Sequence, residues 1–251
     1  MITTSMTAAE TKTEVTGAPA ASLAEAGHDV RGMFDRVAGR YDAANRVMSA
    51  GVDGLWRKKA IGRLLEGLGE TPRLLDLGAG TLDGGIEIVR RVPGARVAAA
   101  DFSRQMLRAG RPKIPAGAVI ETHGADGHHL PYGAGVFDGA FSAFCVRNLR
   151  DLPLGLAELR RVVRPGGRVA IVEFFRADKP RFFFDVYNAR VLPLVGWAIT
   201  GDREAYRYLP DSIAQFRSLA EFVALVREAG FASVEGKPLF PSGVASLVVA
   251  S

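Results

Sequence analysis

Acidic and glycine residues at positions 76–83 form the part of the sequence best suited to hold a nucleotide-like cofactor. An apolar run beginning at Arg73 leads into Asp76, Gly78 and Gly80, and Asp83 follows. A strand that stops at Gly78 and continues as a helix after Gly80 would present unpaired backbone N–H groups to a ligand, and glycine lets that ligand approach closely. We therefore predict a cofactor loop here.

The acid at position 83 discriminates between candidate cofactors. A dinucleotide-binding motif would need a third glycine at that position, and the carboxylate of Asp83 would repel a pyrophosphate. S-adenosylmethionine, which has a sulfonium and no phosphate, suits the loop better. Asp101 ends the next apolar run, about 20 residues beyond the glycines, where an acid grips a ribose diol in such folds. The alternative is a structural turn without a ligand.

The composition favours a single α/β domain. With 251 residues, 48% of them hydrophobic, the chain can form one sizeable core, which we assign to residues 29–251 after a disordered tail at 1–28. The net charge is +5, but the Lys and Arg residues are scattered among acids and form no basic stripe, which argues against nucleic-acid binding. The single cysteine, Cys145, excludes a disulfide framework and a multi-cysteine metal site, so no metal and a cytoplasmic location are expected.

The elements that must position these residues follow a βαβ rhythm. Apolar residues recur at helical spacing within 29–70, with a break near 49–51. This spacing predicts a helical N-terminal cover over the cofactor loop. Strands are predicted at 73–77, 97–101, 119–122, 136–144 and 168–174, with helices between them, a turn at 164–167 and two closing strands at 232–239 and 244–250. This pattern predicts a mostly parallel sheet with helices on both faces. The proline-interrupted segment 175–215 is interpreted as a substrate-side insertion.

The sequence resembles the class I S-adenosylmethionine-dependent methyltransferases and, more closely, the ubiquinone/menaquinone biosynthesis C-methyltransferases. The wider resemblance rests on residues 76–81, Asp101, 126–131 and 163–167. The narrower one rests on residues 34–38, 41–45, 48–51, 56–57, 146–149, 206–209 and 212–213. It implies a Rossmann-like, seven-stranded fold.

Carried over position by position, the resemblance also implies a cofactor site. With the loop residues above, the expected set is Asp76, Gly78, Gly80, Thr81, Asp101, Phe102, Asp126, Gly127 and Ala143. The sequence departs from the family at Ala143, where serine is frequent, and at Leu82, where glycine is. His128 and His129 also stand where small or acidic residues are usual, and we interpret them as loop residues.

Methylation of a ring carbon requires more than a positioned methyl donor, because the ring attacks through carbon when a neighbouring phenol loses its proton. The candidate catalytic residues are Arg147, Asn148, Tyr206 and Tyr208. Arg147 would stabilise a phenolate, since a guanidinium stays charged. The alternatives are an ion pair between Arg147 and Asp151, and packing roles for the two tyrosines.

The resemblance implies transfer of a methyl group from S-adenosylmethionine to a reduced prenylated quinone precursor, of the demethylmenaquinol or ubiquinone-precursor type. Two alternatives stay open: a methyltransferase of soluble small molecules or polyketides, and a non-catalytic cofactor-binding assembly subunit. Apolar residues in the insertion, among them 182–184 and Trp197, either line a groove for the prenyl tail or pack in the core. Trp56 with the basic residues 57–59 forms either a peripheral membrane contact or a solvated helix face. A homodimer is compatible with the sequence.

Overall fold

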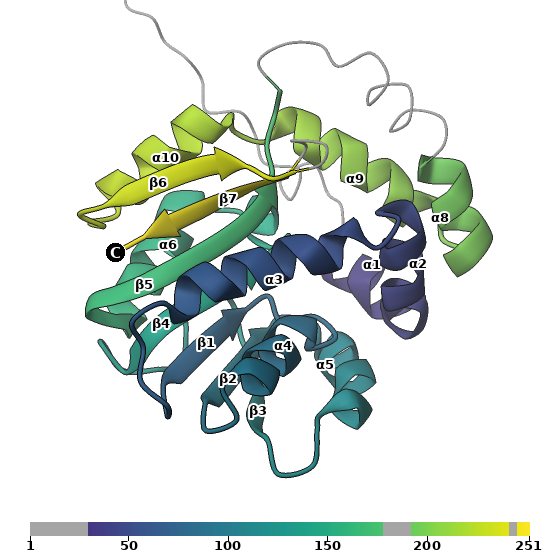
Figure 1. Cartoon of the computed structure of the whole chain (residues 1–251). Coiled ribbons are helices and arrows are strands. Elements are labelled where there is room, and N and C mark those ends of the chain that lie inside the picture. The colour runs from purple at the N-terminus through teal and green to yellow at the C-terminus, as the bar shows by residue number, and fades with distance from the viewer. Residues whose placement is uncertain (1–29, 178–191, 241–244) are drawn as a thin grey trace, which may run out of the picture.

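The computed structural model describes residues 30–177, 192–240 and 245–251 (Figure 1). The tail predicted at 1–28 and the apolar residues 182–184 lie outside these ranges. Seven strands form one sheet in the order β3-β2-β1-β4-β5-β7-β6, in which β7 runs antiparallel to both neighbours. Their bounds are β1 Arg73–Leu77, β2 Arg96–Asp101, β3 Val119–Gly124, β4 Phe137–Ala143, β5 Val163–Phe174, β6 Val234–Pro238 and β7 Ala245–Ala250. The predicted α/β fold is confirmed.

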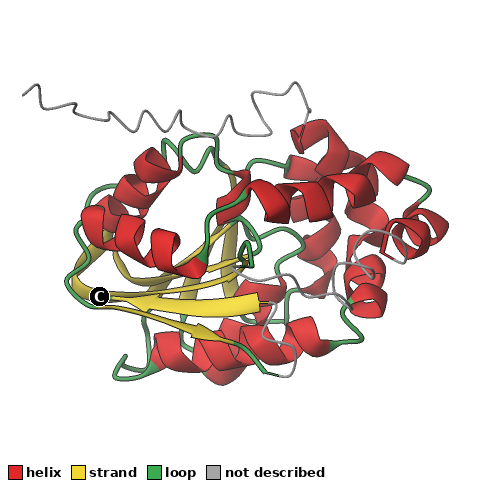
Figure 2. Cartoon of the chain, turned by 90° about the horizontal axis from the view of Figure 1, so that it is seen from above, coloured by secondary structure: helices red, strands yellow, loops and turns green. Residues whose placement is uncertain are grey.

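Helices cover both faces of the sheet, as Figure 2 shows from above. Helices α3 (Val52–Leu65) and α4 (Asp83–Arg91) share one apolar core with the sheet, and α6 (Leu152–Val162) and α10 (Leu219–Glu228) share another. Helix α5 (Arg104–Gly110) packs with the residues around the cofactor loop through Leu107. In β1, Leu74 belongs to the α3 side and Leu75 to the α6 side, since successive side chains of a strand alternate. The central strands are therefore buried on both faces.

The N-terminal cover consists of α1 (Val30–Val37), the 3-10 turn η1 (Ala38–Arg40), α2 (Tyr41–Met48) and α3. The break predicted at 49–51 is confirmed, and Gly51 adopts the left-handed φ of 77° there. The sequence did not reveal the second interruption, at η1. Helices α8 (Leu192–Thr200) and α9 (Arg203–Gln215) lie beside α1 and α2 at one end of the molecule (Figure 1). Residues of α1, α2 and α9 form a third apolar cluster, separate from the two cores of the sheet.

The turn predicted at 164–167 is present as a bulge inside β5. Phe137 of β4 pairs with Val163, and Gly139 pairs with Arg168, so residues 164–167 stand opposite Asp138 alone. Gly166 adopts a φ of 71°, which glycine accommodates without strain.

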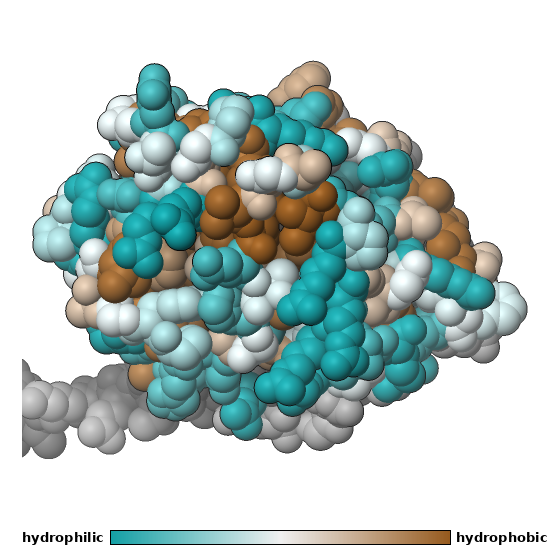
Figure 3. All heavy atoms as spheres, turned by 90° about the horizontal axis from the view of Figure 1, so that it is seen from below, coloured by the Kyte–Doolittle hydropathy of each residue, from teal (hydrophilic) through white to brown (hydrophobic). Residues whose placement is uncertain are grey.

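Among the described residues, no helix combines the length and the apolar character needed to cross a bilayer. On the face seen from below in Figure 3, hydrophobic areas alternate with hydrophilic ones.

Candidate active site

A cavity of about 550 Å³ opens at the carboxyl ends of β1, β2 and β4, beside α1. This is the edge at which parallel α/β sheets bind ligands. Among the predicted site residues, those that line the cavity are Gly78, Gly80, Asp101, Phe102, Asp126, Gly127, Ala143 and Asn148. The N-terminal cover contributes Val30, Arg31, Phe34 and Tyr41. The sequence thus identified part of the cavity wall but not the side chains of the cover.

The glycine loop holds its shape through bonds to β2. The N–H groups of Gly78 and Ala79 donate to the carbonyl oxygen of Ala100, at 2.8 and 3.1 Å. The N–H of Gly80 donates to Asp101 Oδ2 at 2.8 Å. The prediction that these N–H groups face a ligand is therefore wrong. Glycine is needed at position 78 because φ is 69° and a Cβ would lie 2.3 Å from the Cβ and Sγ of Cys145.

The carboxylate of Asp101 is fixed at the end of β2, where it lines the cavity while remaining largely buried. In addition to Gly80, its Oδ1 accepts a hydrogen bond from Ser103 N at 2.8 Å. Burial raises the pKa of Asp101, and these two backbone bonds oppose the shift. The remaining oxygen lone pairs are suitable acceptors for hydroxyl groups of a ligand.

Asp126 and His128 form a second polar part of the wall. Asp126 Oδ1 accepts hydrogen bonds from the backbone N–H of His128 at 2.9 Å and from its Nδ1 at 2.5 Å. His128 Nε2 accepts from Asp151 N at 3.1 Å, so the ring proton is on Nδ1. Burial alone would raise the pKa of Asp126, but the bonds from His128 outweigh it and hold that pKa below the usual range. His128, interpreted from sequence as a loop residue, orients a carboxylate of the cavity.

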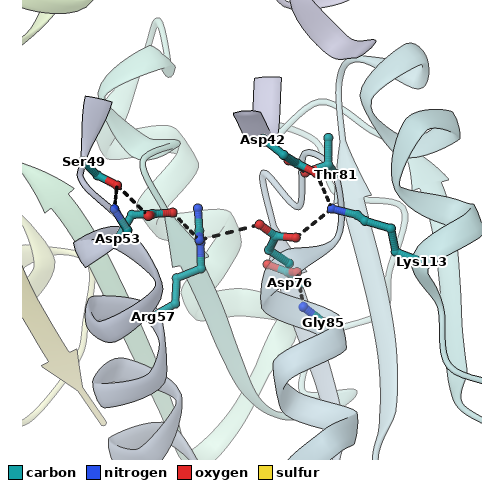
Figure 4. A network of polar contacts seen from close by, with 10 residues as sticks. Asp42, Ser49, Asp53, Arg57, Asp76, Thr81, Gly85 and Lys113 are labelled. Carbon is teal, nitrogen blue, oxygen red and sulfur yellow. Dashed lines mark hydrogen bonds and ion pairs between the residues drawn. The ribbon is translucent and has the colours of Figure 1, made fainter. Parts of the chain in front are cut away.

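Two predicted cofactor residues do not line this cavity. Asp76 is buried beneath the loop and accepts a hydrogen bond from Gly85 N at 2.8 Å. Thr81 donates its hydroxyl proton to Asp42 of α2. Figure 4 shows Asp42 and Thr81 meeting beside Lys113, which binds Asp42 Oδ2 at 2.6 Å. Thr81 therefore joins the cofactor loop to the N-terminal cover.

Asp83 is part of the same network and does not line the cavity. Its Oδ1 lies 2.7 Å from Lys113 Nζ, and its Oδ2 lies 3.6 Å from Arg57 Nη1. These cations balance its charge. Trp56 is also not as expected from sequence: it is buried, and its Nε1 donates to Phe240 O at 2.9 Å. Its ring is therefore not part of a solvated face, whereas Lys58 and Lys59 on the same helix are exposed.

Three of the candidate catalytic residues, Arg147, Asn148 and Tyr208, lie near one another beyond β4. Arg147 pairs with Glu173 and not with Asp151: its Nη1 lies 2.7 Å from Glu173 Oε1, and both side chains are buried. Burial alone would lower the pKa of Arg147, but Glu173 raises it, so the guanidinium remains charged. Tyr208 donates to Asn148 Oδ1 at 2.8 Å.

Tyr206 has the packing role that the sequence left open. Its ring lies against Gly196 of α8, where an added Cβ would be 2.1 Å from the ring. Burial raises the pKa of its hydroxyl to about 12, so the hydroxyl stays protonated at neutral pH. Neither tyrosine nor Arg147 lines the cavity described above.

A model of the ubiE/COQ5 methyltransferase family matches residues 22–250. The chain belongs to this family. It is therefore an S-adenosylmethionine-dependent methyltransferase, as the resemblance implied.

Two relatives support this assignment. The ubiquinone/menaquinone biosynthesis C-methyltransferase UbiE of Paracoccus denitrificans is 37% identical over 223 residues, covering 87% of this chain and 88% of the relative. The demethylmenaquinone methyltransferase of Thermus thermophilus is 41% identical over 203 residues, covering 79% and 91%.

Solved structures agree on the fold. Phosphoethanolamine N-methyltransferase 2 of Haemonchus contortus, in complex with S-adenosylmethionine, gives a TM-score of 0.57 at 15% identity, covering 77% of this chain and 51% of that one. A methyltransferase of Aquifex aeolicus gives 0.53 at 19% identity, covering 76% and 88%. At this level of identity, the likeness supports the fold alone.

The cavity suits the family's cofactor. Gly78 lines its wall, Asp101 offers acceptors for ribose hydroxyls, and Asp126 is oriented by His128. Ala143 lines the wall without a hydroxyl, and the neighbouring Ser142 does not replace it, because its Oγ donates to Leu77 O at 2.9 Å.

Proposed function

We propose that this enzyme methylates a ring carbon of a reduced prenylated quinone precursor. The observation that carries the proposal is the family match, which spans nearly the whole chain and includes the Arg147-Asn148 pair beyond β4. The relatives from Paracoccus and Thermus are named for the same chemistry.

The cofactor supplies an electrophilic methyl group on a sulfonium. The chain's own residues would bind and orient it: Asp101 accepts hydrogen bonds from hydroxyl groups, and Asp126, held by His128, accepts one from an amino group. The cofactor site in this proposal comprises all of the residues predicted from the sequence, and Asp76 and Thr81 act in it by shaping the loop.

On the acceptor side, Arg147 would stabilise the phenolate that makes the ring carbon nucleophilic. Its charge is permanent, and it lies out of water, where a fixed cation stabilises a developing anion more strongly than at the surface. Asn148 reaches the cavity and is oriented by the hydroxyl of Tyr208. In this proposal Tyr208 positions Asn148, and Tyr206 supports the fold of the acceptor side.

The test uses purified enzyme with S-adenosylmethionine and chemically reduced demethylmenaquinone bearing a short prenyl chain. Mass spectrometry should show a product heavier by one methyl group, with S-adenosylhomocysteine formed in equal amount. A tail-less naphthoquinol and a ubiquinone precursor run in parallel. Preference for the tail-less acceptor would favour the soluble-substrate alternative, and cofactor binding without turnover on any acceptor would favour the assembly-subunit alternative.

We also propose peripheral membrane contact, because a prenylated acceptor resides in a bilayer. Exposed apolar side chains on α2, α3 and α8 support it: Val47, Leu55, Leu194 and Trp197. Co-sedimentation with anionic phospholipid vesicles is expected and should weaken when Leu55 and Leu194 are replaced by serine. Light scattering on the same preparation measures whether the enzyme is a homodimer.

A further inference from the structure

A buried acid stands at the end of β5, directly beside Arg147. Glu173 is fully buried between the apolar residues Val172 and Phe174. Its Oε1 accepts hydrogen bonds from Phe174 N at 2.8 Å and from Arg147 Nη1 at 2.7 Å. Its Oε2 accepts from Arg147 N at 3.3 Å. A carboxylate is retained at such a depth only when it is paired and hydrogen-bonded, and Glu173 meets both conditions.

The guanidinium of Arg147 is held from three directions. Besides Glu173, its Nη1 donates to the carbonyl oxygen of Phe144 at 2.9 Å, and its Nε donates to Ser212 Oγ at 3.3 Å. The ring of Phe174 lies 5.9 Å from its Cζ. Of the three guanidinium nitrogens, Nη2 makes no hydrogen bond to the described part of the chain. The orientation of the group is thus fixed, with one nitrogen left to donate.

The segment that carries Arg147 borders the cofactor cavity. Cys145 and Asn148, on either side of Arg147 in the sequence, both line the cofactor cavity. A buried ion pair often stabilises a fold no better than apolar residues of the same volume would. Stability alone is therefore a weak reason for Glu173 and Arg147 at this position, and orientation of a catalytic cation is a stronger one.

We propose that Glu173 is a positioning residue, which holds Arg147 so that Nη2 donates to the phenolate oxygen of the acceptor. The inference rests on the proposed function, since it requires an acceptor that reacts as a phenolate. Glu173 acts through Arg147 and touches neither cofactor nor acceptor.

The test is Glu173→Gln, which keeps the size of the side chain and an acceptor for Phe174 N but removes the charge. We expect kcat with the prenylated quinol to fall about 100-fold, the effect of a small misplacement of a catalytic group. KM for S-adenosylmethionine and the affinity for S-adenosylhomocysteine should stay within about twofold of wild type, because Glu173 does not line the cofactor cavity. Glu87→Gln, which breaks a surface pair with Arg91 on α4, is the matched control and should leave kcat unchanged.

A double variant separates positioning from structural support. If Glu173 acts through Arg147, the kcat of Arg147→Gln/Glu173→Gln should equal that of Arg147→Gln. Multiplying effects, or wild-type kcat in Glu173→Gln, would overturn the proposal.

If Glu173→Gln fails to bind S-adenosylhomocysteine, Glu173→Asp takes its place, because it keeps the charge and withdraws it by one methylene. Reduced kcat with unchanged affinity for S-adenosylhomocysteine is expected, and wild-type kcat refutes the positioning role. A different result would contradict the proposed function itself: the wild-type enzyme would then methylate no quinol.

Discussion

At the scale of the residue, Leu82 combines a strained backbone with complete burial. Its φ is 71°, in the left-handed region that costs a side-chain-bearing residue about 1–2 kcal/mol. Its side chain is fully buried with Ile86 and Leu107 in the cluster around the cofactor loop. A glycine at this position would avoid the strain but could not fill this space. Burial of the leucine therefore offsets its unfavourable backbone conformation.

This balance predicts an unusual order of stability for two variants. Both Leu82→Ala and Leu82→Gly lose about 3–5 kcal/mol of buried contacts. Only the glycine variant also relieves the left-handed backbone, so the alanine variant should be less stable by about 1 kcal/mol. Urea unfolding measures both. The control is Leu156, equally buried in the middle of α6, where glycine should be the worse substitution. The same order at both positions would contradict the strain argument.

The burial of Asp76 leads to a second prediction, which concerns how the stability of the fold depends on pH. Burial raises its pKa to about 7, against about 3.9 in an unfolded chain. The folded state then holds a proton that the unfolded state has lost, so its contribution to stability is full below about pH 4 and declines as pH rises to about 7. The whole change amounts to at most about 4 kcal/mol. Asp76→Asn, a neutral mimic, should be more stable than wild type at pH 8 and similar at pH 4.

The measurement is chemical unfolding of both proteins at several pH values between 4 and 8. The difference in unfolding free energy between them should appear within this window and level off above it. A difference that does not change with pH would mean that Asp76 is ionised in the fold.

At the scale of the element, the contact between α2 and the cofactor loop carries a prediction of its own. Asp42 accepts from Thr81 and pairs with Lys113, which also pairs with Asp83 at the start of α4. Asp42→Asn should weaken this contact and raise KM for S-adenosylmethionine. Because these side chains are about one-third exposed, the expected loss is about 1 kcal/mol or less, which corresponds to about fivefold in KM. Asp138→Asn, at the amino-terminal end of β4 and so at the far end of the strands from the cavity, should leave KM unchanged. An unchanged KM in Asp42→Asn would show that the contact does not support cofactor binding.

The secondary-structure elements were largely predictable from the sequence, whereas the pairing of charged residues between them was not. The strands and the break at 49–51 were predictable because apolar periodicity and turn residues are local signals. The partners of charged residues were not, because the fold chooses them: Asp83 pairs with Lys113, and Arg147 with Glu173, 26 residues away. One signal could have identified Glu173, since a lone acid in the run Val172 to Phe175, at the carboxyl end of a parallel strand, requires a buried partner.

At the scale of the whole molecule, the cofactor cavity lies between two parts with separate cores. The sheet and its helices form the larger part. The smaller cluster joins α1, α2 and α9 through Met33, Ala44 and Tyr206, and α1 supplies Val30 and Phe34 to the cavity wall. A small cluster buries less apolar surface, so it should open locally at a lower free energy than the central strands. A ligand in the cavity contacts both parts and should therefore stabilise the smaller one.

Hydrogen–deuterium exchange tests this coupling. In the absence of ligand, amides of α1 and α2 should exchange faster than those of β1 and β4. Saturating S-adenosylhomocysteine should slow exchange in α1, by about 100-fold at a ligand concentration 100 times its Kd if cluster opening abolishes binding. Helix α10, which contributes nothing to the cavity wall, serves as the internal control. Equal exchange in α1 and β4, or slowing in α10 as large as in α1, would mean that the two parts open as one cooperative unit. In that case the cover would be a fixed wall of the site, and cofactor entry would require opening elsewhere.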